Sequence, residues 1–165
     1  MAAVTTLPAT FVAGNILTAA QMNDLRGAFR VLQVVNATYA VSTANATSTY
    51  ADTGLTATIT PSATSSKVLV FVSQAGCGKE SSNTAVALRL MRGATAIATF
   101  EAYGAFDNTV GINYVGTCGT TYLDSPATTS ATTYKTQLQS ISNTANAIVQ
   151  GNGGTSTITL MEISA

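Results

Sequence analysis

The chain has 165 residues, of which 46% are hydrophobic and only 8% are charged, and its seven basic and seven acidic side chains cancel. This length suits one domain with an appended segment. Proteins that bind nucleic acid concentrate Lys and Arg on one surface. Because the basic residues here are few and scattered, nucleic-acid binding is not expected.

Residues 1–30 have a different pattern from the rest of the chain. Thr18 and Gln21 form a capping box, in which each side chain satisfies a backbone amide at the start of a helix. The apolar spacing that follows predicts one short α-helix over about 18–30. A lone short helix is marginal in water, so we expect this segment to dock on its own domain or on a neighbouring subunit. We therefore predict an N-terminal attachment arm with these interface residues: Phe11, Val12, Ile16, Leu17, Met22, Leu25 and Phe29.

From Val31 onward the apolar periodicity is that of β-strands. Leu55, Ala57 and Ile59 alternate with threonines, which predicts a strand. Residues 67–73 are apolar on both faces and are expected to be a central strand. Further strands are predicted near 86–91, 94–103, 109–123, 132–141 and 155–163, with turn residues between them.

Eight or so short strands at fairly even spacing predict an all-β fold. The natural architecture is an antiparallel β-sandwich, jelly-roll-like, over residues 31–165. The polar residues are mostly threonine, which supplies β-propensity and hydration without charge. A surface with so little charge repulsion suits a protein that sits among identical neighbours.

The stretch VLVFVSQAGCGK, which ends at Lys79, has the outline of a phosphate-binding loop. That motif needs a first glycine at position 73, which is Ser73, and a hydroxyl after the lysine, where the chain has Glu80. The expected alternation of strands and helices is also missing. We therefore interpret Gly76 and Gly78 as turn residues after a central strand, with Lys79 and Glu80 solvated at a loop tip.

The sequence gives thin support for catalysis. It contains no histidine, so the commonest general base is missing. Glu101 and Asp107 flank two aromatic residues, so a two-carboxylate glycosidase is conceivable, although a solvated loop is favoured. Glu162 is expected either to pair with a buried Arg or to lie where its strand becomes exposed. We expect no catalytic residues, no cofactor and no metal site, since Cys77 and Cys118 suggest two reduced, buried thiols.

Two further features concern what the protein contacts. No signal peptide and no run of about 18 apolar residues is visible, so we expect synthesis in a cytoplasm and no membrane partner. Aromatic faces stack on sugars, and a carbohydrate-binding surface is one alternative. Its lining would be Tyr103, Tyr114, Tyr122 and Tyr134.

Several stretches resemble structural proteins of tailed-bacteriophage virions. The stretch TFVAGNILTAAQMNDL at 10–25 is similar to a short N-terminal module of such proteins, with an aromatic residue, AG, LTAA and a helix containing Asn. Three downstream stretches look similar to virion surface proteins: STYADTGLTATITPSATSSKVLVFVS at 48–73, YLDSPATTSATTYKTQLQS at 122–140 and GGTSTITLMEI at 153–163. The resemblance implies a β-sandwich that assembles as a homotrimer and attaches to a capsid or tail through its N-terminal arm.

The resemblance leaves two placements open. In the first, the protein is a capsid decoration protein on the virion surface, where its arm lies on the major capsid protein and cements the shell. In the second, it is a short tail fibre or tail-tip protein that binds a receptor. Fibres usually carry a shaft between anchor and head. This chain passes from helix to β-domain with almost no spacer, which favours decoration.

Overall fold

The computed structural model describes residues 30–142 and 144–164. The seven predicted arm residues, Phe11 to Phe29, lie outside that part, and so does the helix expected over 18–30 except for Arg30. The first strand among the described residues starts at Val31, where the sequence periodicity changes.

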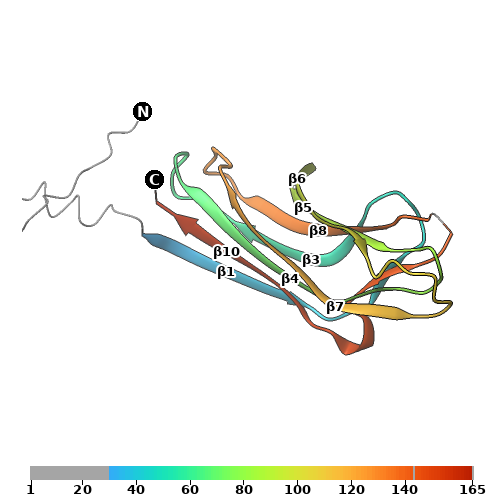
Figure 1. Cartoon of the computed structure of the whole chain (residues 1–165). Helices are drawn as coiled ribbons and strands as arrows, with labels where there is room; N and C mark the ends of the chain where they lie inside the picture. The colour runs from blue at the N-terminus through green and yellow to red at the C-terminus, as the bar shows by residue number, and fades with distance from the viewer. Residues whose placement is uncertain (1–29, 143, 165) are drawn as a thin grey trace, which may run out of the picture.

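Within the described residues, ten strands form two antiparallel sheets (Figure 1). The first sheet has the order β1-β10-β4, and β7 pairs with the free side of β4. These strands are β1 (Val31–Tyr39), β10 (Ser156–Ile163), β4 (Lys67–Lys79) and β7 (Asn113–Asp124). Two short strands extend this sheet beside the last residues of β4. Strand β9 (Ala147–Val149) pairs with Gly78 and Lys79, and β2 (Thr43–Asn45) pairs with β9. A 3-10 turn, Gly151–Gly153, precedes β10.

The second sheet has the order β3-β8-β5-β6. Its strands are β3 (Ala51–Ile59), β8 (Thr132–Ser140), β5 (Val86–Arg92) and β6 (Thr95–Gly104). The two sheets bury alternate residues against each other, which gives a sandwich-like arrangement. The predicted alternation in β3 is confirmed, since Leu55, Ala57 and Ile59 are buried and pack in one cluster with Val70 of β4 and Leu160 of β10.

The strand β4 is longer than predicted, and the turn expected at Gly76 and Gly78 is wrong. Both glycines lie inside β4, which stays paired with β7 as far as the pair Lys79 and Asn113. The pairing register shifts between Gln74 and Cys77, so the strand absorbs the glycines in a bulge instead of turning.

The domain has two distinct ends (Figure 1). At one end, called the terminal end, β1 begins and β10 finishes. The amide of Ser164 donates to the carbonyl of Arg30, and the amide of Arg30 donates to Ser164 Oγ, both at 2.9 Å. The N-terminal segment therefore joins the domain beside its C-terminal strand. The opposite end, called the far end, carries the loop 105–112 between β6 and β7.

Candidate interaction surface

The outer side of the first sheet carries a continuous row of apolar side chains. The register places Val34 opposite Met161, Met161 opposite Leu69, and Leu69 opposite Leu123. Cross-strand partners lie on the same face of a sheet, and all four residues alternate with core residues on their strands. Val34 is 54% exposed and Leu123 is 51% exposed. The row thus crosses four strands at the terminal end of the domain.

Neighbouring positions widen this row into a band. Val31 pairs with Ile163 on one side of the row, and Phe71, which is partly exposed, stands on the other side. We call the whole set the apolar band: Val31, Val34, Leu69, Phe71, Leu123, Met161 and Ile163. The sequence contained a signal for part of this band, because residues 67–73 are apolar on both faces. The register that aligns four distant strands was not visible in it.

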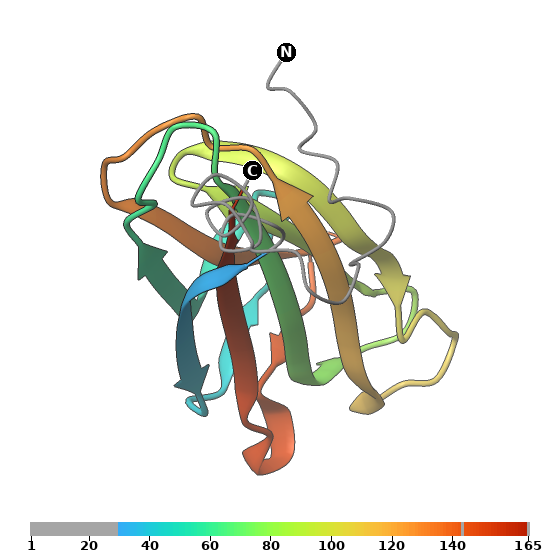
Figure 2. The same cartoon turned by 90° about the vertical axis from the view of Figure 1, so that its left-hand side faces the viewer.

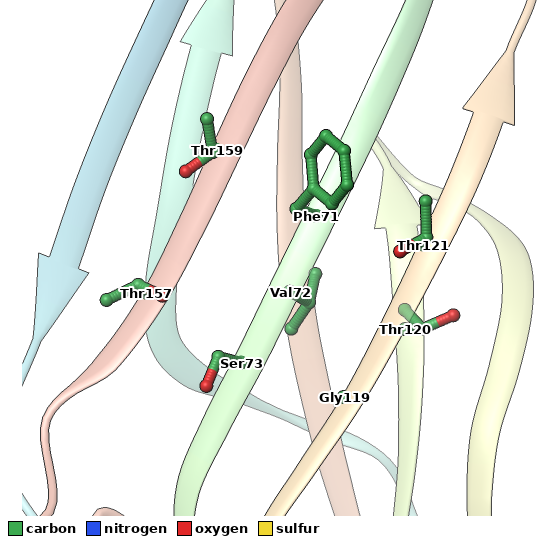
Figure 3. A pocket seen from close by; sticks show the side chains of 8 residues that line it. All are labelled: Phe71, Val72, Ser73, Gly119, Thr120, Thr121, Thr157 and Thr159. Atoms are coloured by element: carbon green, nitrogen blue, oxygen red, sulfur yellow. The ribbon is translucent and has the colours of Figure 1, made fainter.

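Beyond the band, the outer side becomes polar and shallowly hollowed (Figure 3). Phe71 on β4 is paired with Thr159 on one side and with Thr121 on the other. Two residues further along β4, Ser73 is paired with Thr157 and Gly119 in the same way. The hollow is lined by Phe71, Val72, Ser73, Gly119, Thr120, Thr121, Thr157 and Thr159. Small side chains and a glycine leave room there. The outer side therefore passes from an apolar band to an uncharged hydroxyl surface.

Glu162 fastens the terminal end beneath the band. Its side chain is buried, so the expectation that it lies where the strand becomes exposed is wrong. Among the described residues its carboxylate forms no ion pair with an arginine. Its Oε2 accepts from Gln33 Nε2 at 2.6 Å, and its Oε1 accepts from the amide and hydroxyl of Ser62 at 2.7 and 2.6 Å. Burial by itself raises the pKa of this carboxyl, but hydrogen bonds from Gln33, Ser62 and Ser66 outweigh burial and lower it to about 2.

Lys79 is buried, so the expectation that it is solvated at a loop tip is wrong. Its ammonium pairs with the Asp107 carboxylate and donates to the carbonyls of Asp107 and Thr109 at 3.2 and 2.9 Å. Asp107 also accepts from the amide of Thr109 and from Asn113 Nδ2. These contacts, led by that of Lys79, hold the pKa of Asp107 below its usual range. Lys79 thus fixes the far-end loop 105–112 on the domain.

The two carboxylates considered for a glycosidase, Glu101 and Asp107, both take part in hydrogen bonds within the domain. Glu101 Oε1 accepts from the amides of Ala102 and Tyr103 at 2.9 and 3.0 Å, and Asp107 holds Lys79 as described. Both oxygens of Asp107 accept hydrogen bonds, whereas Glu101 Oε2 accepts from Cys118 Sγ at 3.9 Å. The expected surface loop holds for Asp107 but is wrong for Glu101, which lies in strand β6.

The four tyrosines do not line one surface. Tyr134 is buried, and its hydroxyl donates to Asp124 Oδ2 at 2.6 Å. Burial, with the nearby Asp124 carboxylate, raises the pKa of Tyr134. Tyr122 packs against the core from β7. Tyr103 is 65% exposed and stacks edge-to-face on Phe106. A sugar site lined by all four tyrosines is therefore wrong.

The two cysteines are free and buried, as the sequence suggested. They lie on the adjacent strands β4 and β7, and Cys77 Sγ donates to the carbonyl of Gln74 at 3.0 Å. The neighbouring Cys118 thiol and burial raise the pKa of Cys77. Among the described residues, no group of three or more His, Cys, Asp or Glu side chains is placed to hold a metal ion. No helix in that part is long and apolar enough to span a membrane.

No protein-family model matches the chain, and no curated protein matches it.

Proposed function

We propose that this protein is a non-enzymatic structural protein of a phage virion, and that it decorates the capsid. Residues 1–30 form the attachment arm on the major capsid protein, and the β-domain faces outward. The observation that carries the proposal is the position of the apolar surface. The apolar band, in which Val31, Val34 and Leu123 are well exposed, lies at the terminal end, where the apolar N-terminal segment joins β1.

The strand pairing supports a jelly-roll topology for the domain. With the short strands β2 and β9 set aside, the sheets run β1-β10-β4-β7 and β3-β8-β5-β6. The first long strand pairs with the last, β3 with β8, β4 with β7, and β5 with β6. This nested pairing is what a single antiparallel ribbon gives when it is folded across two sheets. Jelly rolls are common in viral capsid and lectin domains, although a fold does not by itself assign a function.

The described polar side chains support a structural role because they hold the domain together. Asp124 accepts from Arg92 Nη1 at 2.8 and 2.9 Å and from the buried Tyr134 hydroxyl, and so ties three strands at the terminal end. Inside the sandwich, Gln74 joins Thr136 of β8 to Ser156 of β10. A domain with such internal satisfaction of polar groups is rigid enough to serve as a scaffold.

A short tail fibre or tail-tip protein, with a β-domain that binds a receptor or a carbohydrate, is the second candidate. One observation favours it: the far-end loop exposes Phe106, Val110 and Ile112 while the buried Lys79 holds the same loop in place. A fixed loop with exposed apolar side chains suits recognition, because little ordering entropy is lost on binding.

The attachment arm can be tested by deleting residues 2–29, which keeps the Arg30 backbone that bonds to Ser164. We expect the shortened protein to retain the β-domain, since both sheets and both core clusters lie after Val31. It should no longer bind virions that lack the protein. The measurement is occupancy on such particles after co-sedimentation, with folding checked by circular dichroism.

A full-length variant provides the matched control for chain length. In it, the arm's apolar residues are replaced by serine: Phe11, Val12, Ile16, Leu17, Met22, Leu25 and Phe29. It should fail to bind just as the deletion does. Unchanged occupancy of either folded variant on capsids would refute attachment through the arm. Binding of the wild-type protein to tail tips alone would favour the second candidate.

A further inference from the structure

We propose that the apolar band is a contact surface between copies of this chain, so that the first sheet packs its outer side against another copy. The inference adds a surface in the β-domain to the attachment arm, and it concerns association of the protein with itself. It can therefore be tested in solution without any particle.

The first argument is the composition of β4. Strands that are covered on both faces read as nearly continuous apolar runs, whereas strands with one wet face alternate. In β4, the inward residues Val68, Val70 and Val72 are buried, while the outward Leu69 and Phe71 are apolar as well. Figure 2 shows β1, β10, β4 and β7 side by side in blue, red, green and orange, and no described strand crosses their outer side. The sequence of β4 is thus that of a strand covered twice, on a sheet that the described residues cover once.

The second argument is that the band complements itself. The central pair of the row is Met161 on β10 and Leu69 on β4, which are antiparallel neighbours. A second copy can face this sheet about a two-fold axis that lies in the contact plane, parallel to the strands and above the midpoint of this pair. This arrangement sets Met161 against Leu69 and Val34 against Leu123. Because all four positions are apolar, a second copy turned in this way meets apolar groups at every position. Such an isologous contact is the usual way in which identical subunits associate.

The third argument is charge. Lys67 is the one charged side chain that β1, β10, β4 and β7 direct outward among the described residues around the band. A charged partner binds best to a surface of opposite charge, and the outer side of this sheet carries almost no charge. Two identical faces with a single charged side chain each repel each other little, so another copy of the chain fits the surface best.

The fourth argument is size. Four strands spaced about 4.8 Å apart, each about nine residues long at about 3.3 Å per residue, present on the order of 600 Å² in projection. The accessible area of a ridged surface exceeds its projection. A standard protein–protein interface buries about 800 Å² on each partner. The outer side of this sheet is therefore large enough for a stable contact between copies.

The test is the mass of the full-length protein by sedimentation velocity and light scattering. We expect the wild-type protein to form a multiple of the 16.8 kDa chain. Leu123→Asp and Val34→Asp place a charge in the band at positions that are half exposed in the single domain, so each domain should still fold. Each should weaken association by about 30-fold or more, because the contact would then bury a carboxylate that has no partner. Val110→Asp, at an 83% exposed position in the far-end loop, is the matched control and should associate like the wild type.

Two chains per assembly in the wild type, with single chains in both band variants, would support the proposal, whereas three chains would overturn the two-fold arrangement. A wild type that stays a single chain at its highest soluble concentration would overturn it. If the wild type stays a single chain and both band variants lower the melting temperature, the result would indicate that residues 1–29 of the same chain cover the band. Band variants that keep the wild-type mass would overturn it as well. None of these outcomes uses particle binding, so a failure here is distinguishable from a failure of the virion proposal.

Discussion

At the scale of single residues, the terminal end of the domain is held by a buried carboxylate. Glu162 on β10 takes hydrogen bonds from Gln33 on β1 and from Ser62 in the loop before β4. Gln33 Nε2 also donates to the carbonyl of Thr60 at 2.7 Å. One acidic side chain thus joins β1, at the edge of the first sheet, to the loop that connects β3 of the second sheet with β4. The apolar band lies on the other side of these same strands, so Glu162 positions the band from within.

This geometry predicts an acid-sensitive contribution to stability. The folded pKa of Glu162 is about 2, below its ordinary value of 4.5. The depressed pKa means that its contribution is fully present above pH 4.5 and is lost as the pH falls through about 2. Glu162→Gln should lower stability at neutral pH by about 1–3 kcal/mol, because hydrogen bonds to a charged group are lost. It should also flatten the decline between pH 4.5 and 2. Thermal unfolding at a series of pH values measures both effects.

Asp52→Asn is the control for this substitution. The Asp52 carboxylate pairs with Lys135 at the surface, where its side chain is 52% exposed. Exposed ion pairs contribute about 0–1 kcal/mol, so this variant should follow the wild-type profile closely. A Glu162→Gln profile parallel to that of the wild type would contradict the assigned role of Glu162.

At the scale of elements, strand β3 depends on one glycine. Gly54 has φ +87°, and a Cβ at this position would lie 2.3 Å from the Tyr39 ring. The pairing register between β3 and β8 shifts between Asp52 and Thr56. The irregularity brings β3 close beneath the end of β1, where Tyr39 packs against the core.

Gly54→Ala should therefore destabilise the domain by about 2–4 kcal/mol, through left-handed backbone strain and overpacking against Tyr39. Gly93→Ala is the matched control, because Gly93 has φ +56° but no heavy atom lies within 4 Å of the added Cβ. That variant should cost only the backbone term of about 1–2 kcal/mol. Urea unfolding of the two variants measures the difference. Equal losses would show that the contact with Tyr39 is unimportant.

The elements that the sequence predicted well are those with strong local signals. The alternation of Leu55, Ala57 and Ile59 depends only on neighbours two positions apart, and the structure has that strand. The glycines near the end of β4 were misassigned because glycine favours a bulge as readily as a turn. Lys79 was placed in solvent because its partners, Asp107 and Thr109, lie 28 and 30 positions away in the chain.

The apolar band marks the limit of prediction from one sequence. Val34, Leu69, Leu123 and Met161 are spread over most of the chain and are brought into one row only by the register of three strand pairs. A slip of one residue would turn any of these strands to the opposite face. The apolar character of each position was visible in the sequence, but their common location was not.

At the scale of the whole molecule, the two ends of the domain carry different features. The terminal end combines the band, the junction with the N-terminal segment and the buried Glu162, whereas the far end carries the loop held by Lys79. Among the described residues, three ion pairs use six of the charged side chains within the domain itself. The other six charged side chains of that part are three basic and three acidic, so no excess of one sign is left to keep copies apart or to attract a charged partner. This arrangement suits attachment at one end and exposure at the other.

Self-association through such a surface should respond to temperature more than to salt. Contacts between apolar groups weaken on cooling, because their driving force is largely entropic near room temperature. Ion pairs at a surface are instead screened as ionic strength rises, with a Debye length of about 10 Å at 0.1 M. We expect the association constant to fall between 25 and 5 °C, roughly as hydrophobic burial predicts, and to change little between about 0.05 and 0.5 M NaCl. Lys67→Ala removes the charge beside the band and should leave association equal or stronger. Association that NaCl abolishes would instead mean that charged groups outside the band hold the copies together.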